Sequence, residues 1–219
     1  KAAEAVLQQE ASLTASGHRP ANAGQLRATA HLLAAESAHA LQDRGGREEH
    51  LKRALEQASA REAQETHEGA LMRAAQWALD DRDPQAAVTS LRGLPQGAAR
   101  RTLALRMRLK ASRQAGEPAE ALETARLLAK HRGFSPVAAR SIVRGLAMDL
   151  LSGAYDVTQL QRAWDQLEPT ERKLPEVAIH AARRLAALGG DAHLGRDWLL
   201  PVWEAQAELN DSLRVKLVG

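Results

Sequence analysis

The sequence predicts an all-α protein, a helical-repeat solenoid of about five antiparallel helix pairs, and two observations predict this class. Alanine (45 residues) and leucine (32 residues), both strong helix formers, fill about a third of the 219 positions, whereas Val and Ile together supply only 11. Similar short motifs also recur along the chain at near-regular spacing. We expect residues 1–219 to form a single domain, because no Pro- or Gly-rich stretch is long enough to be an interdomain linker.

Each helix pair is located by one close-packing position in each of its two helices. In the first helices these positions are, in chain order, Ala35, Ala75, Leu109, Met148 and Ala182. In the second helices they are Leu51, Leu91, Ala125, Trp164 and Trp198. Small residues at most of the first positions let two helix backbones approach closely. Since no pair can bury its apolar face alone, the stacked pairs are expected to share one continuous core.

Glycine, proline and aspartate mark the expected turns between these helices. The turns are, in chain order, Gly45-Gly46, Asp83-Pro84, Gly116-Glu117-Pro118 and Gly189-Gly190-Asp191. Ser135 is expected to cap a helix that Pro136 opens. Residues 1–10 have the composition of a helix interior, and residues 205–219 that of the opening helix of another pair. We therefore expect the sequence to be a fragment of a longer chain.

The recurring motif has the pattern of a known repeat. Residues 116–128 (GEPAEALETARLL) resemble the second half of a tetratricopeptide repeat (TPR), and residues 83–94 (DPQAAVTSLRGL) carry the same pattern. Ala87 and Ala121 of these two motifs lie 34 residues apart, which is the period of this repeat. An irregular helical bundle with accidental spacing is the alternative. A long coiled coil is disfavoured, because Pro and Gly interrupt the helical pattern.

Two further stretches resemble one particular family. One consists of residues 32–38 (LLAAESA) and 47–58 (REEHLKRALEQA), and the other of Trp164, Leu167 and residues 172–178 (RKLPEVA). Both are similar to the TPR region of HemY-type proteins, which are encoded among proteobacterial haem-biosynthesis genes. The resemblance implies a role in haem (porphyrin) biosynthesis and two membrane helices upstream of the repeats. By the positive-inside tendency, it implies repeats on the cytoplasmic face of the inner membrane.

The sequence carries no motif for catalysis or for a cofactor. It has no cysteine and no GxGxxG, GxxxxGK[ST], HExxH or GxSxG, so we predict no enzyme, no cofactor and no metal centre. His31 and His39 are the nearest pair of histidines, but eight residues put them about two helical turns apart, too far to share a metal ion. All eight histidines are interpreted as solvated surface residues: His18, His31, His39, His50, His67, His131, His180 and His193. The carboxylates Glu48, Glu49, Asp80, Asp81 and Asp83 are interpreted as helix caps and solvated ion pairs.

One helix is strongly basic on one side. Residues 100–113 hold six basic residues and no acidic one, and Arg106, Lys110 and Arg113 share a face at i, i+4 and i+7. In the repeat register this face belongs to a first helix, which lines the concave groove of a TPR superhelix. Arg183 falls at the position of Lys110 two units later, so the basic face is expected to continue there. The alternative is a basic helix face that serves only solubility.

These observations favour a protein-interaction scaffold over two other functions. The expected partner is a protein or peptide with an acidic segment, and the resemblance adds haem-biosynthesis enzymes as candidate partners. The alternative function is porphyrin or haem binding, which the family context alone suggests. Nucleic-acid binding is disfavoured, because the net charge is only +3. Trp164 and Trp198 are expected in the core, and Trp203 at the surface.

Overall fold

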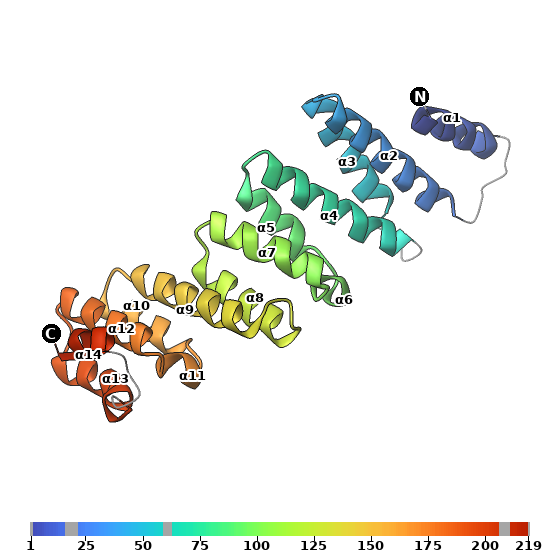
Figure 1. Cartoon of the computed structure of the whole chain (residues 1–219). Helices are drawn as coiled ribbons and strands as arrows, with labels where there is room; N and C mark the ends of the chain where they lie inside the picture. Colours follow the sequence, from blue (N-terminus) through green and yellow to red (C-terminus); the bar gives the residue numbers. More distant parts are fainter. Residues whose placement is uncertain (1, 16–21, 59–62, 206–210, 219) are drawn as a thin grey trace. The chain divides into compact units, whose positions relative to one another are not determined.

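The protein is all-α. The computed structural model describes residues 2–15, 22–58, 63–205 and 211–218, and within these ranges it has fourteen helices and no strand (Figure 1). The chain divides into two compact units, one up to residue 111 and one from residue 112 on. The two units are described separately below. The expectation of one continuous solenoid over all 219 residues stays a prediction.

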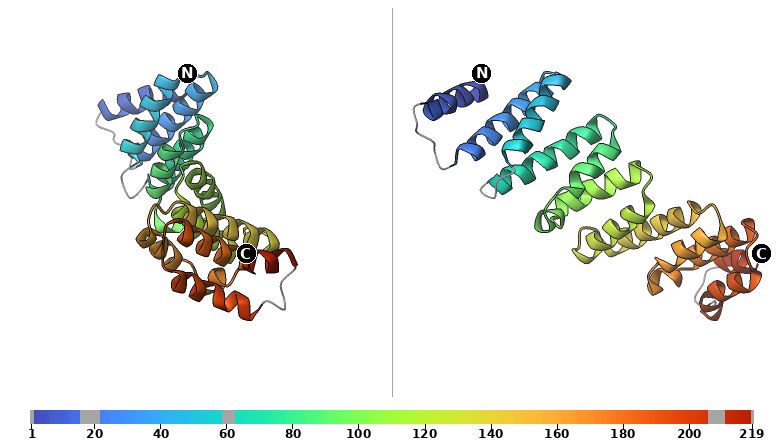
Figure 2. Two further views of the ribbon diagram at one scale, coloured as in Figure 1. Left: turned by 90° about the vertical axis from the view of Figure 1, so that its left-hand side faces the viewer. Right: turned by 180° about the vertical axis from the view of Figure 1, so that it is seen from behind.

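The first unit contains the helices of the N-terminal half of the chain. They are α1 (Ala2–Ala15), α2 (Ala23–Ala40), α3 (Arg44–Gln57), α4 (Gln64–Asp80), α5 (Pro84–Arg92), α6 (Gln96–Ala99) and most of α7 (Thr102–Gln114). Helices α2 and α3 form one antiparallel pair, and α4 and α5 form the next (Figures 1 and 2). Helix α1 packs on α2, and α4 packs on both helices of the first pair.

The second unit continues the same sequential packing. It contains the end of α7, then α8 (Pro118–Lys130), α9 (Pro136–Ser152), α10 (Val157–Asp165), α11 (Pro169–Arg172), α12 (Pro175–Ala187), α13 (Ala192–Glu204) and α14 (Asp211–Val218). Helix α8 packs on α9, while α12 packs on α9, α10 and α13. All ten helices of the five predicted pairs are present. The single-turn helices α6 and α11 were not predicted.

Most of the expected turns are built by the residues that predicted them. The side chain of Asp83 accepts a hydrogen bond from the Ala86 N–H (3.0 Å) and starts α5, and Pro84 occupies the first turn of that helix. Ser135 caps α9 in the same way, through the N–H of Ala138 at 3.2 Å. Asp191 caps α13. These caps satisfy N–H groups that the first turn of a helix leaves without a partner.

The expected Gly45-Gly46 turn is wrong by a few residues. Both glycines lie inside the first turn of α3, and the chain turns at residues 41–43 instead. Asp43 caps α3 through a hydrogen bond from the Gly46 N–H (2.9 Å), and a Cβ on Gly46 would lie 2.3 Å from an oxygen of this carboxylate. Gly46 therefore makes room for the cap and does not make the turn.

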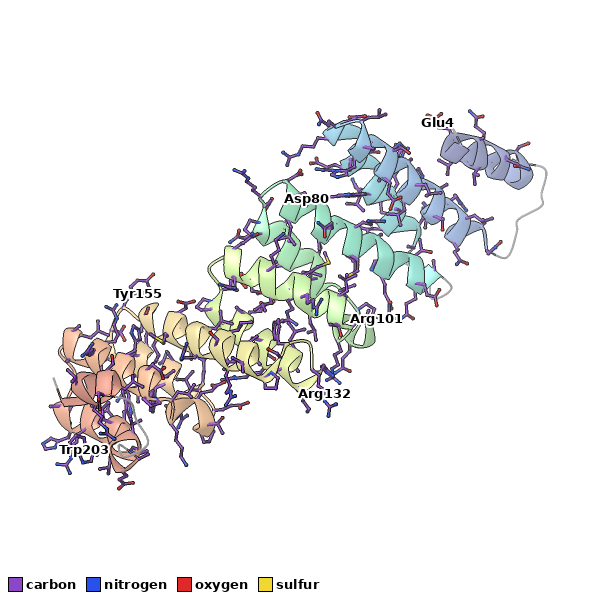
Figure 3. All side chains as sticks on the ribbon, in the orientation of Figure 1. Glu4, Asp80, Arg101, Arg132, Tyr155 and Trp203 are labelled. Carbon is purple, nitrogen blue, oxygen red and sulfur yellow. The ribbon has the colours of Figure 1, made fainter. Side chains whose placement is uncertain are left out.

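The predicted close-packing positions are largely confirmed as core positions. Seven of the ten are buried: Ala35, Ala75 and Leu109 in the first helices, and Leu91, Ala125, Trp164 and Trp198 in the second helices. The other three are half-buried: Leu51, Met148 and Ala182. The rings of Trp164 (α10) and Trp198 (α13) stack with centroids 4.7 Å apart. Trp203 is exposed, as expected, and is labelled in Figure 3. The helix expected within residues 205–219 is present as α14, with 206–210 outside the described residues.

Candidate protein-interaction site

Helix α7 separates an apolar side from a basic side, as its sequence predicts. Leu105, Leu109 and Ser112 are buried. Arg106, Lys110 and Arg113 are all exposed, and their spacing of four and three residues places them along one side of the helix. We call these three residues the α7 basic row. A helix with this division buries its aliphatic face and presents three cations to solvent.

The surroundings of the α7 basic row add an apolar contact. Leu103 is exposed and precedes Arg106 by three residues, so it lies on the same side of α7. Arg101, just before the helix, has a guanidinium nitrogen 3.2 Å from a carboxylate oxygen of Glu68 in α4 (Arg101 is labelled in Figure 3). This ion pair engages Glu68, which is itself buried. The α7 basic row thus combines positive charge with an exposed leucine.

The fourth predicted site residue, Arg183, lies in the second unit. It is exposed on α12, which also carries the buried residues Val177, Ala178 and Ala181 on its core side. The expected continuation of the basic face from Lys110 to Arg183 runs from one unit to the other and stays a prediction.

A polar cluster that the sequence did not predict joins α3 to the end of α4. Arg47 is buried, and its guanidinium binds both carboxylate oxygens of Asp81. The same guanidinium donates to Nδ1 of His39 (3.2 Å) and lies 5.9 Å from the ring centroid of Trp77, on which His39 also stacks. The hydrogen bond from Arg47 lowers the pKa of Asp81 below its ordinary value. Asp81 itself is exposed and forms an ion pair at the end of α4, as predicted, but the sequence did not predict that its partner is a buried arginine.

Glu48, Glu49 and Asp83 behave as predicted, whereas Asp80 accepts a hydrogen bond from Gln76 of its own helix (2.9 Å). Glu48 and Glu49 form exposed ion pairs with Arg44 and Arg53, each four residues away on α3. Asp83 is the cap of α5. The spacing of Arg47 and Asp81 is 34 residues, one repeat period, which is the signal that would have predicted their pairing.

The interpretation of all histidines as solvated residues is wrong for His31. This side chain of α2 is buried, and its Nδ1 lies 3.0 Å from Nδ1 of His50 in α3. The two nitrogens share a single proton, because one must donate and the other accept. Burial, and then the charge of His50, lowers the pKa of His31. Within the described ranges no three His, Cys, Asp or Glu side chains converge as metal ligands. His18 lies outside the described residues.

Ser152 of α9 and His180 of α12 form a hydrogen bond between two helices of the second unit. Oγ of Ser152 lies 2.8 Å from Nε2 of His180, and the hydroxyl donates to the carbonyl oxygen of Met148 at 2.8 Å. The Ser152 hydroxyl has one proton, and both the Met148 carbonyl oxygen and Nε2 of His180 lie within hydrogen-bond distance of it. Burial, and then Arg184, lowers the pKa of His180. The pair connects α9 to α12.

None of the described helices is both long enough and apolar enough to cross a bilayer. Comparisons with protein-family models, curated proteins and solved structures found no match to this chain.

Proposed function

We propose that this protein is a non-enzymatic interaction scaffold, a TPR-like helical repeat that binds an acidic segment of another protein. The exposed α7 basic row, Arg106, Lys110 and Arg113, carries the proposal. Guanidinium groups bind carboxylates in a bidentate fashion, and three cations along one helix match acidic side chains spaced along a peptide.

The arrangement of the helices supports a protein partner. Consecutive antiparallel pairs present long rows of side chains, which suit an extended or helical segment better than a small molecule. Exposed Leu103 beside the α7 basic row adds an apolar contact that an acidic peptide with one aliphatic residue would use. A net charge of +3 is small for a surface that binds nucleic acid.

The resemblance to HemY-type proteins extends this proposal to a cellular role. On that basis the partners are haem-biosynthesis enzymes, and the scaffold is held at the inner membrane by upstream helices, on its cytoplasmic face. The support for this part is the likeness of residues 32–38 and 47–58. Haem or porphyrin binding, the alternative, rests on the resemblance alone. His31 and His180 each have a ring nitrogen engaged by a neighbouring side chain.

The test uses charge reversal with a matched control. The variant Arg106→Glu, Lys110→Glu, Arg113→Glu removes the α7 basic row, and Lys52→Glu, Arg140→Glu, Lys173→Glu changes three other exposed basic residues by the same total charge. The probe is a fluorescent peptide of glutamates around a central leucine, followed by anisotropy at several salt concentrations. We expect the first variant to bind at least about tenfold more weakly than the control. Equal binding by the two variants would overturn the proposal.

A further inference from the structure

The helix pair α12–α13 carries an open apolar groove of about 680 Å³ in the second unit. It is lined by Ala182, Leu185 and Ala186 of α12 and by Gly195, Leu199, Leu200 and Trp203 of α13. Leu200 and Trp203 are 43% and 45% exposed. The groove thus has small residues and large exposed apolar residues on the same face.

The exposed apolar residues of α13 have no counterpart in the preceding second helix, α10. In the register that aligns Trp164 with Trp198, Leu200 of α13 corresponds to Gln166, the exposed C-cap residue of α10. Helix α10 ends before any counterpart of Trp203. Where the earlier pair presents an amide to solvent, α13 presents a leucine.

Two exposed charges of α13 lie on the same side of the helix as Leu200. Arg196, Leu200 and Glu204 follow one another at i, i+4 and i+8, so they lie on one stripe of the helix, with the two charges about 12 Å apart along its axis. Within the described part of the chain, neither Arg196 nor Glu204 has an ion-pair partner. A second α13 that runs antiparallel across Leu200 puts its own glutamate opposite Arg196 and its own arginine opposite Glu204. The stripe is therefore complementary to itself.

We propose that two copies of this chain associate through α13, packed antiparallel about a twofold axis at Leu200. Arg196 of each copy faces Glu204 of the other, and Trp203 of each copy enters the α12–α13 groove of the other. The groove is large enough for an indole, and burying a tryptophan on both sides of the axis provides most of the apolar contact. Because both copies use the same face, the assembly ends at a dimer. This inference is independent of the proposed function of α7.

The first test is a charge-swap experiment by analytical ultracentrifugation of the full chain. We expect the wild-type chain to form dimers with a dissociation constant in the micromolar range. Arg196→Glu and Glu204→Arg each create two like-charge contacts, and each is expected to weaken the dimer at least about tenfold. An equimolar mixture of the two variants restores both opposite-charge contacts and should form a heterodimer. The double variant should restore the homodimer.

Both reversals favour the helix itself, so loss of the dimer is not explained by unfolding. Arg196→Glu places a negative charge nearer the N-terminal end of α13, and Glu204→Arg places a positive charge at its C-terminal end. The helix dipole favours both changes. A wild-type chain that stays monomeric at every concentration would overturn the proposal and leave the groove to a helix of another protein. A mixture that does not associate would also overturn it.

The second test locates the apolar part of the interface. Trp203→Glu and Leu200→Glu are expected to abolish the dimer, with circular dichroism reporting that the helices remain. Val137→Glu on α9 is the matched control, because Val137 is 71% exposed and lies elsewhere in the same unit. Its dimer should be as stable as that of the wild-type chain. If Val137→Glu dissociates the dimer as strongly as Trp203→Glu, the α13 interface is wrong.

Discussion

In the ion pair between buried Arg47 and Asp81, we predict that replacing the aspartate costs more stability than replacing the arginine. Asp81→Ala removes the carboxylate and leaves the guanidinium of Arg47 buried, with its side chain 9% exposed. Removing one partner of a fully buried ion pair costs about 3–5 kcal/mol. The Asp81 side chain is 27% exposed, and His39 still accepts one N–H of the guanidinium. We therefore expect a loss of about 2 kcal/mol.

Replacing the arginine should cost less. Arg47→Met keeps an unbranched chain against Trp77 and removes the buried cation altogether, so the loss should be about 1 kcal/mol or less. The double variant Arg47→Met, Asp81→Ala should be close to Arg47→Met alone, because Asp81 then has no cation to neutralise. The informative result is which of the two single variants, Asp81→Ala or Arg47→Met, is more stable.

Urea unfolding followed by circular dichroism measures these losses. A loss of about 2 kcal/mol lowers the urea midpoint by about 1 M for a typical slope. The fluorescence of Trp77, which lies in the cluster, provides a local readout once the three other tryptophans are replaced by phenylalanine in every protein compared. If Arg47→Met is less stable than Asp81→Ala, the reasoning about the uncompensated cation is refuted.

Three other predictions concern pH, glycine and haem. The folded chain lowers the pKa of His31 and His180 from about 6.5, so below that pH the unfolded chain binds protons that the folded chain does not. The free energy of unfolding should therefore fall as the pH drops below 6.5. Urea titrations at several pH values should show a less steep fall in the variant His31→Asn, His180→Asn. Gly69→Ala in α4 has open space around its new Cβ and should raise the thermal midpoint through a gain of about 0.5–1 kcal/mol. Gly190→Ala places its Cβ 2.3 Å from a methyl carbon of Leu185 and should lower the midpoint. If both variants change the thermal midpoint in the same direction, the packing argument is contradicted. Titration with haemin should leave its Soret band unchanged, and a saturable shift that a histidine variant abolishes would instead favour the haem-binding alternative.

The sequence predicted the helices well, because the signals for them are local. Alanine and leucine content, first-turn prolines and the caps Asp83 and Ser135 each act within a few residues. The exposure of the α7 basic row followed from helical periodicity for the same reason. The single-turn helices α6 and α11 were missed, since four residues are too few to show a period.

The contacts between helices were predicted less well. The pairing of His31 with His50 depends on which faces of α2 and α3 meet, and the search for metal ligands compared histidines within one helix. Arg47 and Asp81 form an ion pair between α3 and the end of α4, yet each was interpreted from its immediate neighbours. The apolar surface of α13 was anticipated only through Trp203, since the groove beside it depends on how α12 and α13 pack on each other.

The stacked rings of Trp164 and Trp198 give the second unit a built-in optical signal. Two indoles held face to face at 4.7 Å couple their electronic transitions, and such coupling produces a paired positive and negative band in the circular dichroism spectrum. The amplitude of this couplet depends on both rings keeping their mutual orientation, and therefore on α10 and α13 staying together. Separation of these two helices can thus be followed without any label, and independently of events in the first unit.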